Sequence, residues 1–289
     1  MIITKLQCGL GNQMFQYAAG LALAHKHRTV QKLDVSWFRS YDGMANHNQY
    51  GLNCFNILEQ FATQDEVLEI TQDPASKHVA PVVDFYDAFS NLPDETYLDG
   101  FFQSEKFFLQ ISEIVRQHFS FRFPPTAEVS RWAEQIQSSA PSVCLHVRRG
   151  DYVSLYQDKF GLLGPDYYRN ALHTLKERHS NLTVFVFSDD IDSAERELHL
   201  DLPHYFVRAT EHHNFHDKIR LMALCNHAII SNSTFAWWGA WLIPGKEKTV
   251  IAPKPWFTGE ELNQLQIVSD SWIQISRTAR DSFMTPSIS

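Results

Sequence analysis

This 289-residue sequence lacks the features that mark several classes of protein. Its four cysteines are far apart, so they form no paired metal-binding spacing and indicate free thiols in a reducing compartment. No apolar run approaches the roughly 18 residues of a membrane-spanning helix, and the N-terminus has no basic segment before a long apolar stretch, as a signal peptide would. The net charge of −8 disfavours a nucleic-acid-binding protein. We therefore expect a cytoplasmic protein that binds no nucleic acid and whose membrane association, if any, is peripheral.

The composition, 44% hydrophobic and 20% charged, is that of a globular chain long enough for two domains. The Pro-Pro pair at 124–125 and the polar residues 138–142 suggest a boundary between residues 1–130 and 131–289. A strand at 2–7, a glycine turn and a helix at 13–27 open the first domain, which continues with a strand at 97–102 and a helix at 105–119. In the second domain, strands near 143, 182, 205, 228 and 249 alternate with helices, as in an open parallel sheet.

The segment most informative about function is residues 231–238, SNSTFAWW, between an apolar strand-like run and an apolar helix-like run. Small polar residues at such a turn present backbone N–H groups, hydroxyls and the positive end of a helix, which suit an anion such as phosphate. We expect Asn232, Ser233 and Thr234 to contact a phosphate. The spacing of the tryptophans instead predicts packing in the core.

A second candidate for phosphate binding is residues 146–151, HVRRGD, where another strand ends. Ligands of open α/β sheets bind at this edge. Strand alternation places His146 and Arg148 on one side and Arg149 on the other, unless the strand has already ended. Guanidinium groups hold phosphate oxygens well, and Asp151 could orient an arginine or act as a base. The structural alternative is an Arg–Asp pair beside a core histidine.

Residues 188–192, SDDID, follow a third strand. Because these residues stand at a strand end, Ser188 or Asp189 could contact a ribose or a base. Asp190 and Asp192 formally match an Asp-x-Asp pair, which could hold a divalent metal on a diphosphate. The alternative that we favour is a helix start capped by Ser188 or Asp189, with the remaining acids in the first turn.

The N-terminal GLGNQM, residues 9–14, resembles half of a dinucleotide fingerprint, since Met14 stands where the third glycine is expected. It forms either a tight structural turn or a place where a ligand approaches the backbone of Gly9 and Gly11, with Asn12 as a polar contact. A dinucleotide-dependent oxidoreductase would rest on these glycines alone.

With these residues in place, the chain resembles the bacterial α-1,2-fucosyltransferases, the GDP-fucose-dependent inverting glycosyltransferases of family 11. The matching segments are GLGNQMFQY, GFFQSEKFF, HVRRGDY, FSDD and SNSTFAWWGA, in this order. The resemblance implies a GT-B-like α/β fold, with two facing Rossmann-like domains and parallel sheets. The C-terminal domain would bind GDP-fucose, and the acceptor, a galactose-terminated oligosaccharide or lipid-linked glycan, would lie mostly against the N-terminal domain.

The implied reaction is inverting transfer of L-fucose from GDP-β-L-fucose to the 2-hydroxyl of a terminal β-galactose, without a metal or other cofactor, in assembly of a surface polysaccharide at the inner membrane. By the same resemblance, Arg148 holds the β-phosphate and His146 recognises guanosine. The position where relatives read guanine with an aspartate is here occupied by residues 226–227, Asn-His. The donor site predicted from motifs and resemblance comprises Gly11, Asn12, His146, Arg148, Arg149, Ser188, Asp189, Asn232, Ser233 and Thr234.

No motif identifies the base that would take the acceptor proton, and Asp151, Glu105 and Asp99 are the candidates. Two other functions stay open. One is a metal-dependent glycosyltransferase that uses Asp190 and Asp192. The other is a non-catalytic protein that binds a GDP-sugar or a glycan.

Overall fold

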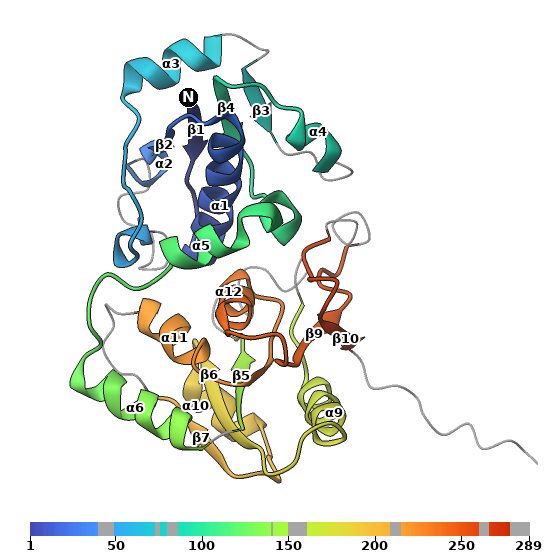
Figure 1. Cartoon of the computed structure of the whole chain (residues 1–289). Coiled ribbons are helices and arrows are strands. Elements are labelled where there is room, and N and C mark those ends of the chain that lie inside the picture. Colours follow the sequence, from blue (N-terminus) through green and yellow to red (C-terminus); the bar gives the residue numbers. More distant parts are fainter. Residues whose placement is uncertain are drawn as a thin grey trace, which may run out of the picture.

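The computed structural model consists of two α/β halves, each built on a parallel sheet (Figure 1). It describes residues 1–39, 49–72, 76–79, 86–139, 141–149, 161–208, 215–259 and 266–277. Asp151 therefore lies outside the described residues. Within the described parts of the chain, no helix is both long and apolar enough to cross a membrane.

The first sheet has the strand order β2-β1-β4-β3, and all of its strands are parallel. Alternate side chains of β1 point to opposite faces: Ile2 packs with helix α1, whereas Ile3 packs with Ile70 of α3. The connection after β1 therefore runs on one face and the connection after β2 on the other. The elements are β1 (Ile2–Lys5), α1 (Leu10–His27), β2 (Gln31–Asp34), α2 (Ser36–Arg39), η1 (Leu52–Cys54), α3 (Gln64–Gln72), β3 (Lys77–Val79), α4 (Tyr86–Ser90) and β4 (Thr96–Asp99).

The second sheet has the order β10-β9-β8-β5-β6-β7, again fully parallel. Val143 and Leu145 of β5 pack with helices α9 and α10, whereas Cys144 belongs to the core cluster that includes residues of α11 and α12. Both faces are thus covered, which explains the continuous apolar strands in the sequence. The elements are β5 (Ser142–Val147), α9 (Pro165–Lys176), β6 (Thr183–Ser188), α10 (Ile191–Glu197), β7 (His204–Phe206), α11 (Phe215–Met222), β8 (His227–Ile229), α12 (Thr234–Leu242), β9 (Val250–Lys254) and β10 (Ile273–Ser276).

The connection between the halves differs from the single helix expected at 105–119. The structure has two 3-10 turns, η2 (Glu105–Phe107) and η3 (Leu109–Ile111), before the short helix α5 (Ser112–His118). At Phe108, between the turns, φ is −135° and ψ is 9°, outside the helical range. This break accompanies burial of the Phe108 ring, which stacks on Trp238 at 5.4 Å between centroids. Helix α6 (Ala127–Ser138) then packs on α11 of the second half.

The two halves share one hydrophobic core where α1 and α5 face α12 (Figure 1). The ring of Phe15 lies 4.5 Å from Trp237 and 4.9 Å from Trp238, between centroids. Trp237 and Trp238 are fully buried and Trp241 is nearly so, which confirms the prediction that the tryptophans are core residues. Burying such large rings strongly favours one fixed arrangement of the two halves.

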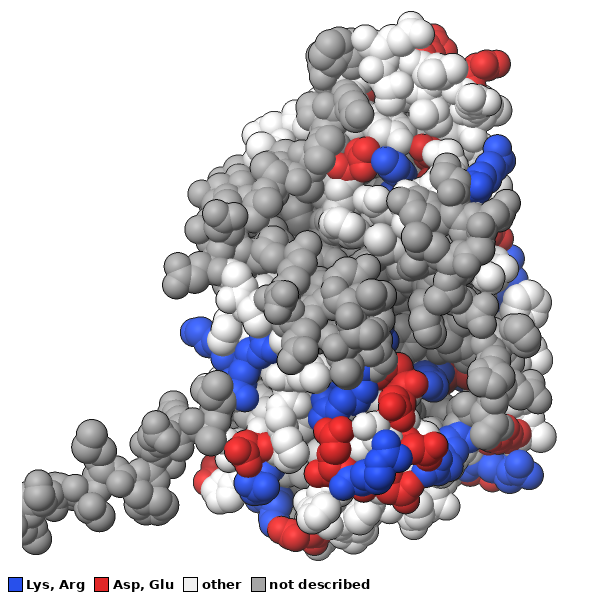
Figure 2. All heavy atoms as spheres, turned by 180° about the vertical axis from the view of Figure 1, so that it is seen from behind, with Lys and Arg blue, Asp and Glu red and all other residues white. Residues whose placement is uncertain are grey.

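Charged side chains of both signs cover the second half. On the face seen in Figure 2, the described Lys and Arg side chains there are interspersed with Asp and Glu. Several are paired, for example Arg208 with Asp192 and Arg169 with Asp166. That surface does not present the continuous basic stripe of a nucleic-acid-binding face.

Candidate active site

The two motifs predicted to bind phosphate lie together at the carboxyl ends of neighbouring strands of the second sheet, the switch-point crevice of such folds. Strands β5 and β8 are neighbours, but the chain leaves β5 toward the α9 face and leaves β8 toward the α12 face. Ligands bind open α/β sheets at the carboxyl ends of such a strand pair. His146 lies near the carboxyl end of β5, and Ser231 follows β8. The Nδ1 atom of His146 is 2.8 Å from the Oγ atom of Ser231. The sequence motifs therefore flank a single site.

The N-terminal ends of α1 and α12 meet beside this crevice. A Cβ atom on Gly11 would lie 2.5 Å from the backbone nitrogen of Phe235 and 2.7 Å from the hydroxyl of Thr234. Gly9, the N-cap of α1, has no side chain, and the side chain of Ser233, the N-cap of α12, accepts no capping hydrogen bond. Two positive helix ends are thus placed together without capping side chains, an arrangement that favours an anion.

Gly11 therefore has a different role from the one predicted. The space beside its Cα is filled by residues 234–235 of the same chain, so the missing side chain admits the second helix rather than a ligand. Asn12, one residue later, accepts a hydrogen bond on Oδ1 from Nε2 of Gln103 at 2.8 Å. The predicted contact of Asn12 with the sugar-nucleotide donor stays a prediction.

Arg148 is held in place by Asp189 from the neighbouring strand end. Its Nη1 atom lies 3.0 Å from Oδ2 of Asp189, and both side chains are mostly buried. The other oxygen of Asp189, Oδ1, accepts from the backbone N–H of Arg149 at 2.8 Å. Asp189 is thereby fixed at two atoms and orients the guanidinium, a role that sequence analysis did not assign to it.

Lys218 of α11 adds a second cation that the motifs did not reveal. Its Nζ donates to the carbonyl of Ser188 at 2.8 Å. Burial, partly offset by Asp189, together with the charge of Arg148, lowers the pKa of Lys218. Two cations thus share one nearby carboxylate, which leaves the site net positive. A helix was predicted between the strands near 205 and 228, but a lone lysine within it carried no signal.

His146 is almost fully buried between these groups. Burial lowers its pKa to about 3, and the charges of Arg148 and Lys218 act in the same direction. The imidazole is therefore neutral near pH 7, with one nitrogen as donor and the other as acceptor. A neutral ring can recognise polar edges of a ligand without adding charge.

Arg149 does not join Arg148, which corrects the prediction that both arginines bind the donor. Its side chain is buried and donates through Nε to Oε2 of Glu197 at 2.9 Å and through Nη1 to the carbonyl of Leu163 at 3.2 Å. Both contacts lie on the side of β5 that is covered by α9 and α10. We assign Arg149 a structural role.

The acids after β6 are engaged in local structure. Asp190, rather than Ser188 or Asp189, is the N-cap of α10, where Oδ1 accepts from the backbone N–H of Ser193 at 3.0 Å. Ser188 donates to the carbonyl of Asp190, and Asp192 pairs with Arg208 at 2.6 Å. Among the described residues, no group of three or more metal-ligating side chains is found.

Glu105 also lies away from the crevice. Its Oε2 accepts from the indole nitrogen of Trp241 at 3.0 Å. Trp241 is near the C-terminal end of α12, roughly 10 Å along the helix axis from Thr234 at the site. This placement argues against Glu105 as the base.

Asn232 is buried in the turn between β8 and α12. It donates from Nδ2 to the carbonyl of Trp256 at 3.2 Å, so it shapes the turn.

A cavity of about 400 Å³ lies between the halves next to α11. Buried Asp217, which neighbours Lys218, lines it and forms an ion pair of 3.0 Å with Arg220. Residues 226–227 do not line this cavity. Asn226 accepts from the backbone N–H of Ser142, at the amino end of β5. The residues around the cavity are Gln49, Tyr50, Gly51, Asn53, Cys54, Phe123, Pro124, Thr126, His216 and Asp217.

Comparison with known proteins identifies the family of this chain. Residues 1–276 match the family model of Glycosyl transferase family 11. The chain is 30% identical over 294 residues to an alpha-1,2-colitosyltransferase of Escherichia coli, covering 96% of this chain and 99% of that one. It is 30% identical over 300 residues to the O-antigen biosynthesis glycosyltransferase WbnK of Escherichia coli, covering 93% and 99%. The human galactoside alpha-(1,2)-fucosyltransferase 1 is 25% identical over 258 residues, covering 81% and 63%.

Among solved structures, the fucosyltransferase NodZ from Bradyrhizobium superimposes with a TM-score of 0.53 at 15% identity, covering 84% of this chain and 93% of that one. A structure of NodZ alpha-1,6-fucosyltransferase co-crystallised with GDP gives 0.52 at 16% identity, covering 84% and 92%. This likeness concerns the fold alone, and it confirms the GT-B-like α/β architecture expected from the sequence.

Proposed function

Because the chain belongs to glycosyl transferase family 11 and is a glycosyltransferase, we propose that it transfers L-fucose from GDP-β-L-fucose to the 2-hydroxyl of a terminal β-galactose. The observation that carries this proposal is the crevice between β5 and β8, where Arg148, Lys218 and the start of α12 form a net positive site. The names of relatives that act as alpha-1,2-colitosyl- and alpha-(1,2)-fucosyltransferases support both the type of sugar and the linkage. The name of a relative that acts in O-antigen biosynthesis supports a glycan acceptor.

The proposed mechanism follows from charge. Breaking the bond between fucose and GDP develops negative charge on the β-phosphate. Arg148, oriented by Asp189, and the N-terminal end of α12 at Thr234 would stabilise that charge without rearranging. The acceptor hydroxyl then attacks the opposite face of the sugar, which inverts the anomeric centre.

We propose that two groups, Asp217 and His146, recognise the base. The carboxylate of Asp217 lies in the cavity between the halves, and such a group can accept two hydrogen bonds from the N1–H and amino group of guanine. Neutral His146 lies at the crevice itself. On this proposal, Asp217 of α11 and His146 of β5 recognise the base, and residues 226–227 do not.

The proton acceptor would come from the first half. Asp99 ends β4 at the carboxyl edge of the first sheet, with Oδ2 3.0 Å from Nζ of Lys5. Asp34, at the end of β2, has its oxygens occupied by the hydroxyl of Tyr97 and the backbone N–H of Ser36. We therefore propose Asp99 as the base among the described residues. Asp151 stays a prediction.

We also propose that the reaction needs no metal. The cations that would balance the diphosphate are side chains, and the carboxylates of Asp190 and Asp192 are engaged by a helix cap and by Arg208. Transfer in excess EDTA should match transfer without it. Loss of transfer in EDTA, restored by Mg²⁺ or Mn²⁺, would support the metal-dependent alternative.

GDP-colitose is a second candidate for the donor sugar, because the chain is 30% identical to an alpha-1,2-colitosyltransferase over almost its full length. Colitose is a fucose that lacks the 3-hydroxyl. A site that hydrogen-bonds this hydroxyl would discriminate against GDP-colitose by roughly 10⁴-fold. A site without such a contact would accept both sugars.

The deciding experiment incubates the protein with GDP-fucose or GDP-colitose and methyl β-galactoside or a β-galactose-terminated disaccharide. Release of GDP and formation of a 2-linked product are measured together. Product with GDP-fucose supports the proposal. Preference for GDP-colitose changes the donor, and tight GDP-sugar binding without any product indicates the non-catalytic alternative.

A further inference from the structure

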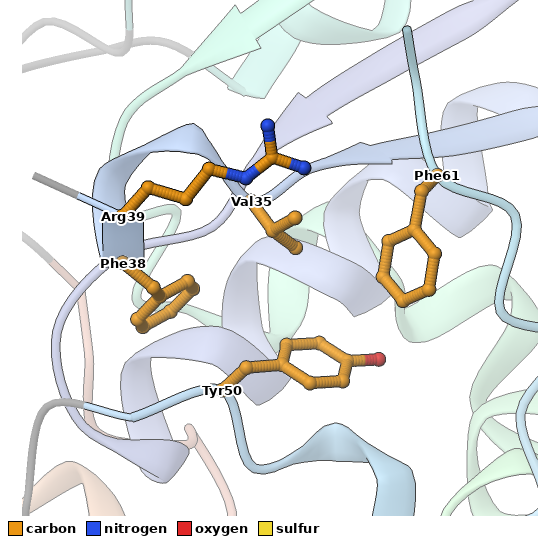
Figure 3. A pocket seen from close by; sticks show the side chains of 5 residues that line it. All are labelled: Val35, Phe38, Arg39, Tyr50 and Phe61. Atoms are coloured by element: carbon orange, nitrogen blue, oxygen red, sulfur yellow. The ribbon is translucent and has the colours of Figure 1, made fainter.

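A second cavity, of about 300 Å³, lies in the first half and is not part of the crevice (Figure 3). Its walls are mostly apolar, with the rings of Phe38, Tyr50 and Phe61 arranged around Val35 and the guanidinium of Arg39 at one side. The volume is at the lower end of the range for ligand sites. It suits one sugar ring rather than an oligosaccharide.

The cavity lies next to the carboxyl ends of β1 and β2, where the first sheet has a switch point of its own. The chain leaves β1 toward α1 on one face and leaves neighbouring β2 toward α3 on the other. The carboxyl ends of β1 and β2 therefore form the switch point at which such sheets bind ligands. Val35, Phe38 and Arg39 all directly follow β2. The donor crevice occupies the equivalent place in the second sheet.

Tyr50 connects this cavity to the space between the halves, because it lines both cavities. Its neighbours in sequence are tied to α1: Gln13 donates to the carbonyl of Gln49 at 2.8 Å and accepts from the N–H of Gly51 at 2.9 Å. Since Gln13 is in the first turn of α1, Tyr50 is held beside the helix end that meets α12. A molecule in the cavity would lie next to the proposed donor site.

The chemistry of the walls fits a carbohydrate. The Tyr50 ring is nearly perpendicular to Phe38 and Phe61, at 70° and 74°, and the Phe61 side chain remains 48% exposed. An exposed aromatic face is suited to the C–H groups of a pyranose. Arg39 supplies donors for sugar oxygens, and among the described residues no carboxylate pairs with it. The Tyr50 hydroxyl donates to Glu59, which Arg122 neutralises at 3.0 Å.

From these observations we propose that the Phe38–Tyr50–Phe61 cavity is an acceptor subsite, which binds a sugar ring of the glycan other than the galactose that is modified. This inference rests on the proposed transfer to a galactoside. The ring stacks on Phe61, and Arg39 donates to its hydroxyl or acidic oxygens. The subsite makes extended acceptors better substrates than a single galactose.

The test compares methyl β-galactoside with a disaccharide and a trisaccharide that end in the same β-galactose. In the wild type, kcat/KM for the best extended acceptor should exceed that for methyl β-galactoside by about tenfold or more. Phe61→Ala and Phe61→Leu should both remove this advantage through a higher KM, and Arg39→Gln should weaken it. Turnover of methyl β-galactoside and KM for GDP-fucose should not change.

Leu68→Ala is the matched control, since Leu68 is a similarly exposed apolar side chain on α3 outside the cavity. Phe61→Leu keeps apolar bulk and serves if Phe61→Ala does not fold. The subsite is overturned if the wild type gains nothing from an extended acceptor, or if the Phe61 variants affect all acceptors equally. Absence of transfer to every acceptor in the wild type would instead overturn the proposed function.

Discussion

The indole nitrogen of Trp238 donates to the carbonyl of Gly11 at 3.0 Å, across 227 residues of chain. This bond joins the start of α1 in the first half to α12 in the second. Arg116 adds a further tie from the first half, since its Nη2 donates to the carbonyl of Trp241 at 2.8 Å. The helix end that would hold the diphosphate is therefore positioned by both halves, and substitutions at this contact should affect stability and activity together.

Gly11→Ala should destabilise the protein by about 1–3 kcal/mol and reduce transfer, because the new Cβ would meet the backbone of residues 234–235. Urea denaturation and a transfer assay measure both effects. Gly259→Ala is the control, as no atom of the described residues lies within 4 Å of its added Cβ. Equal stability of the two variants would contradict the close helix contact.

Arg148→Ala should fold normally and lose roughly 10²–10³-fold in kcat, because a charge on the leaving phosphate loses its main partner. Asp189→Asn should show a smaller loss, since Asp189 acts by orienting Arg148. The control Arg169→Ala removes an exposed arginine paired with Asp166 and should leave kcat unchanged. Near-wild-type turnover by folded Arg148→Ala would refute the proposed site.

Arg149→Ala should act on stability instead. Its guanidinium is buried and bonded to Glu197 and to backbone carbonyls, so its loss should cost about 2 kcal/mol. Glu197→Gln keeps an acceptor and should cost less. A large fall in kcat without any loss of stability would return Arg149 to the donor site.

His146 predicts a dependence of stability on pH. Its folded pKa of about 3 lies below the ordinary value of 6.5, so the unfolded chain binds the proton more readily. Stability contributed by this residue is present above pH 6.5 and falls as the pH falls toward 3, by about 2 kcal/mol between pH 7 and pH 5. Urea denaturation of the wild type and His146→Asn over this range should give curves of different slope. Parallel curves would show that His146 is not held neutral.

Asp99→Asn should lower kcat by about 10²-fold if this carboxylate takes the acceptor proton, with little change in KM for GDP-fucose. The acid limb of the kcat–pH profile should also flatten. Asp94→Asn, at an exposed carboxylate paired with the N-terminus, is the control. An unaltered pH profile would exclude Asp99 and leave Asp151 as the candidate.

Local patterns predicted much of the fold. Helix α1, strands β5 and β6 and the helices of the second half lie within a few residues of their predicted positions, because their apolar periodicity is strong. Strands β2, β3 and β10 were missed. They are three or four residues long, and β2 and β10 contain charged or polar residues that give no apolar run.

The candidate site was likewise predictable from the sequence only in part. His146, Arg148 and Ser233 were predicted because they stand in motifs at strand ends, and Rossmann-like topology brings strand ends together. Lys218 and Asp217 were not, since a single charged residue on a helix resembles any exposed surface residue in sequence. Arg149 and Gly11 were placed in the donor site by proximity in the motif, whereas their side-chain direction and close contacts depend on other segments.

From the sequence alone, strand–helix alternation indicated an open parallel sheet in the second half, because such alternation admits few topologies. The order of the motifs indicated the family, and the resemblance to it implied two such halves. Only the tertiary structure decided which charges face the crevice: Asp189 orients Arg148, Lys218 joins them from α11, and Glu197 draws Arg149 away. The tertiary structure also revealed that the tryptophans of residues 231–238 join the two halves. These outcomes depend on contacts between residues far apart in the chain, which no local pattern encodes.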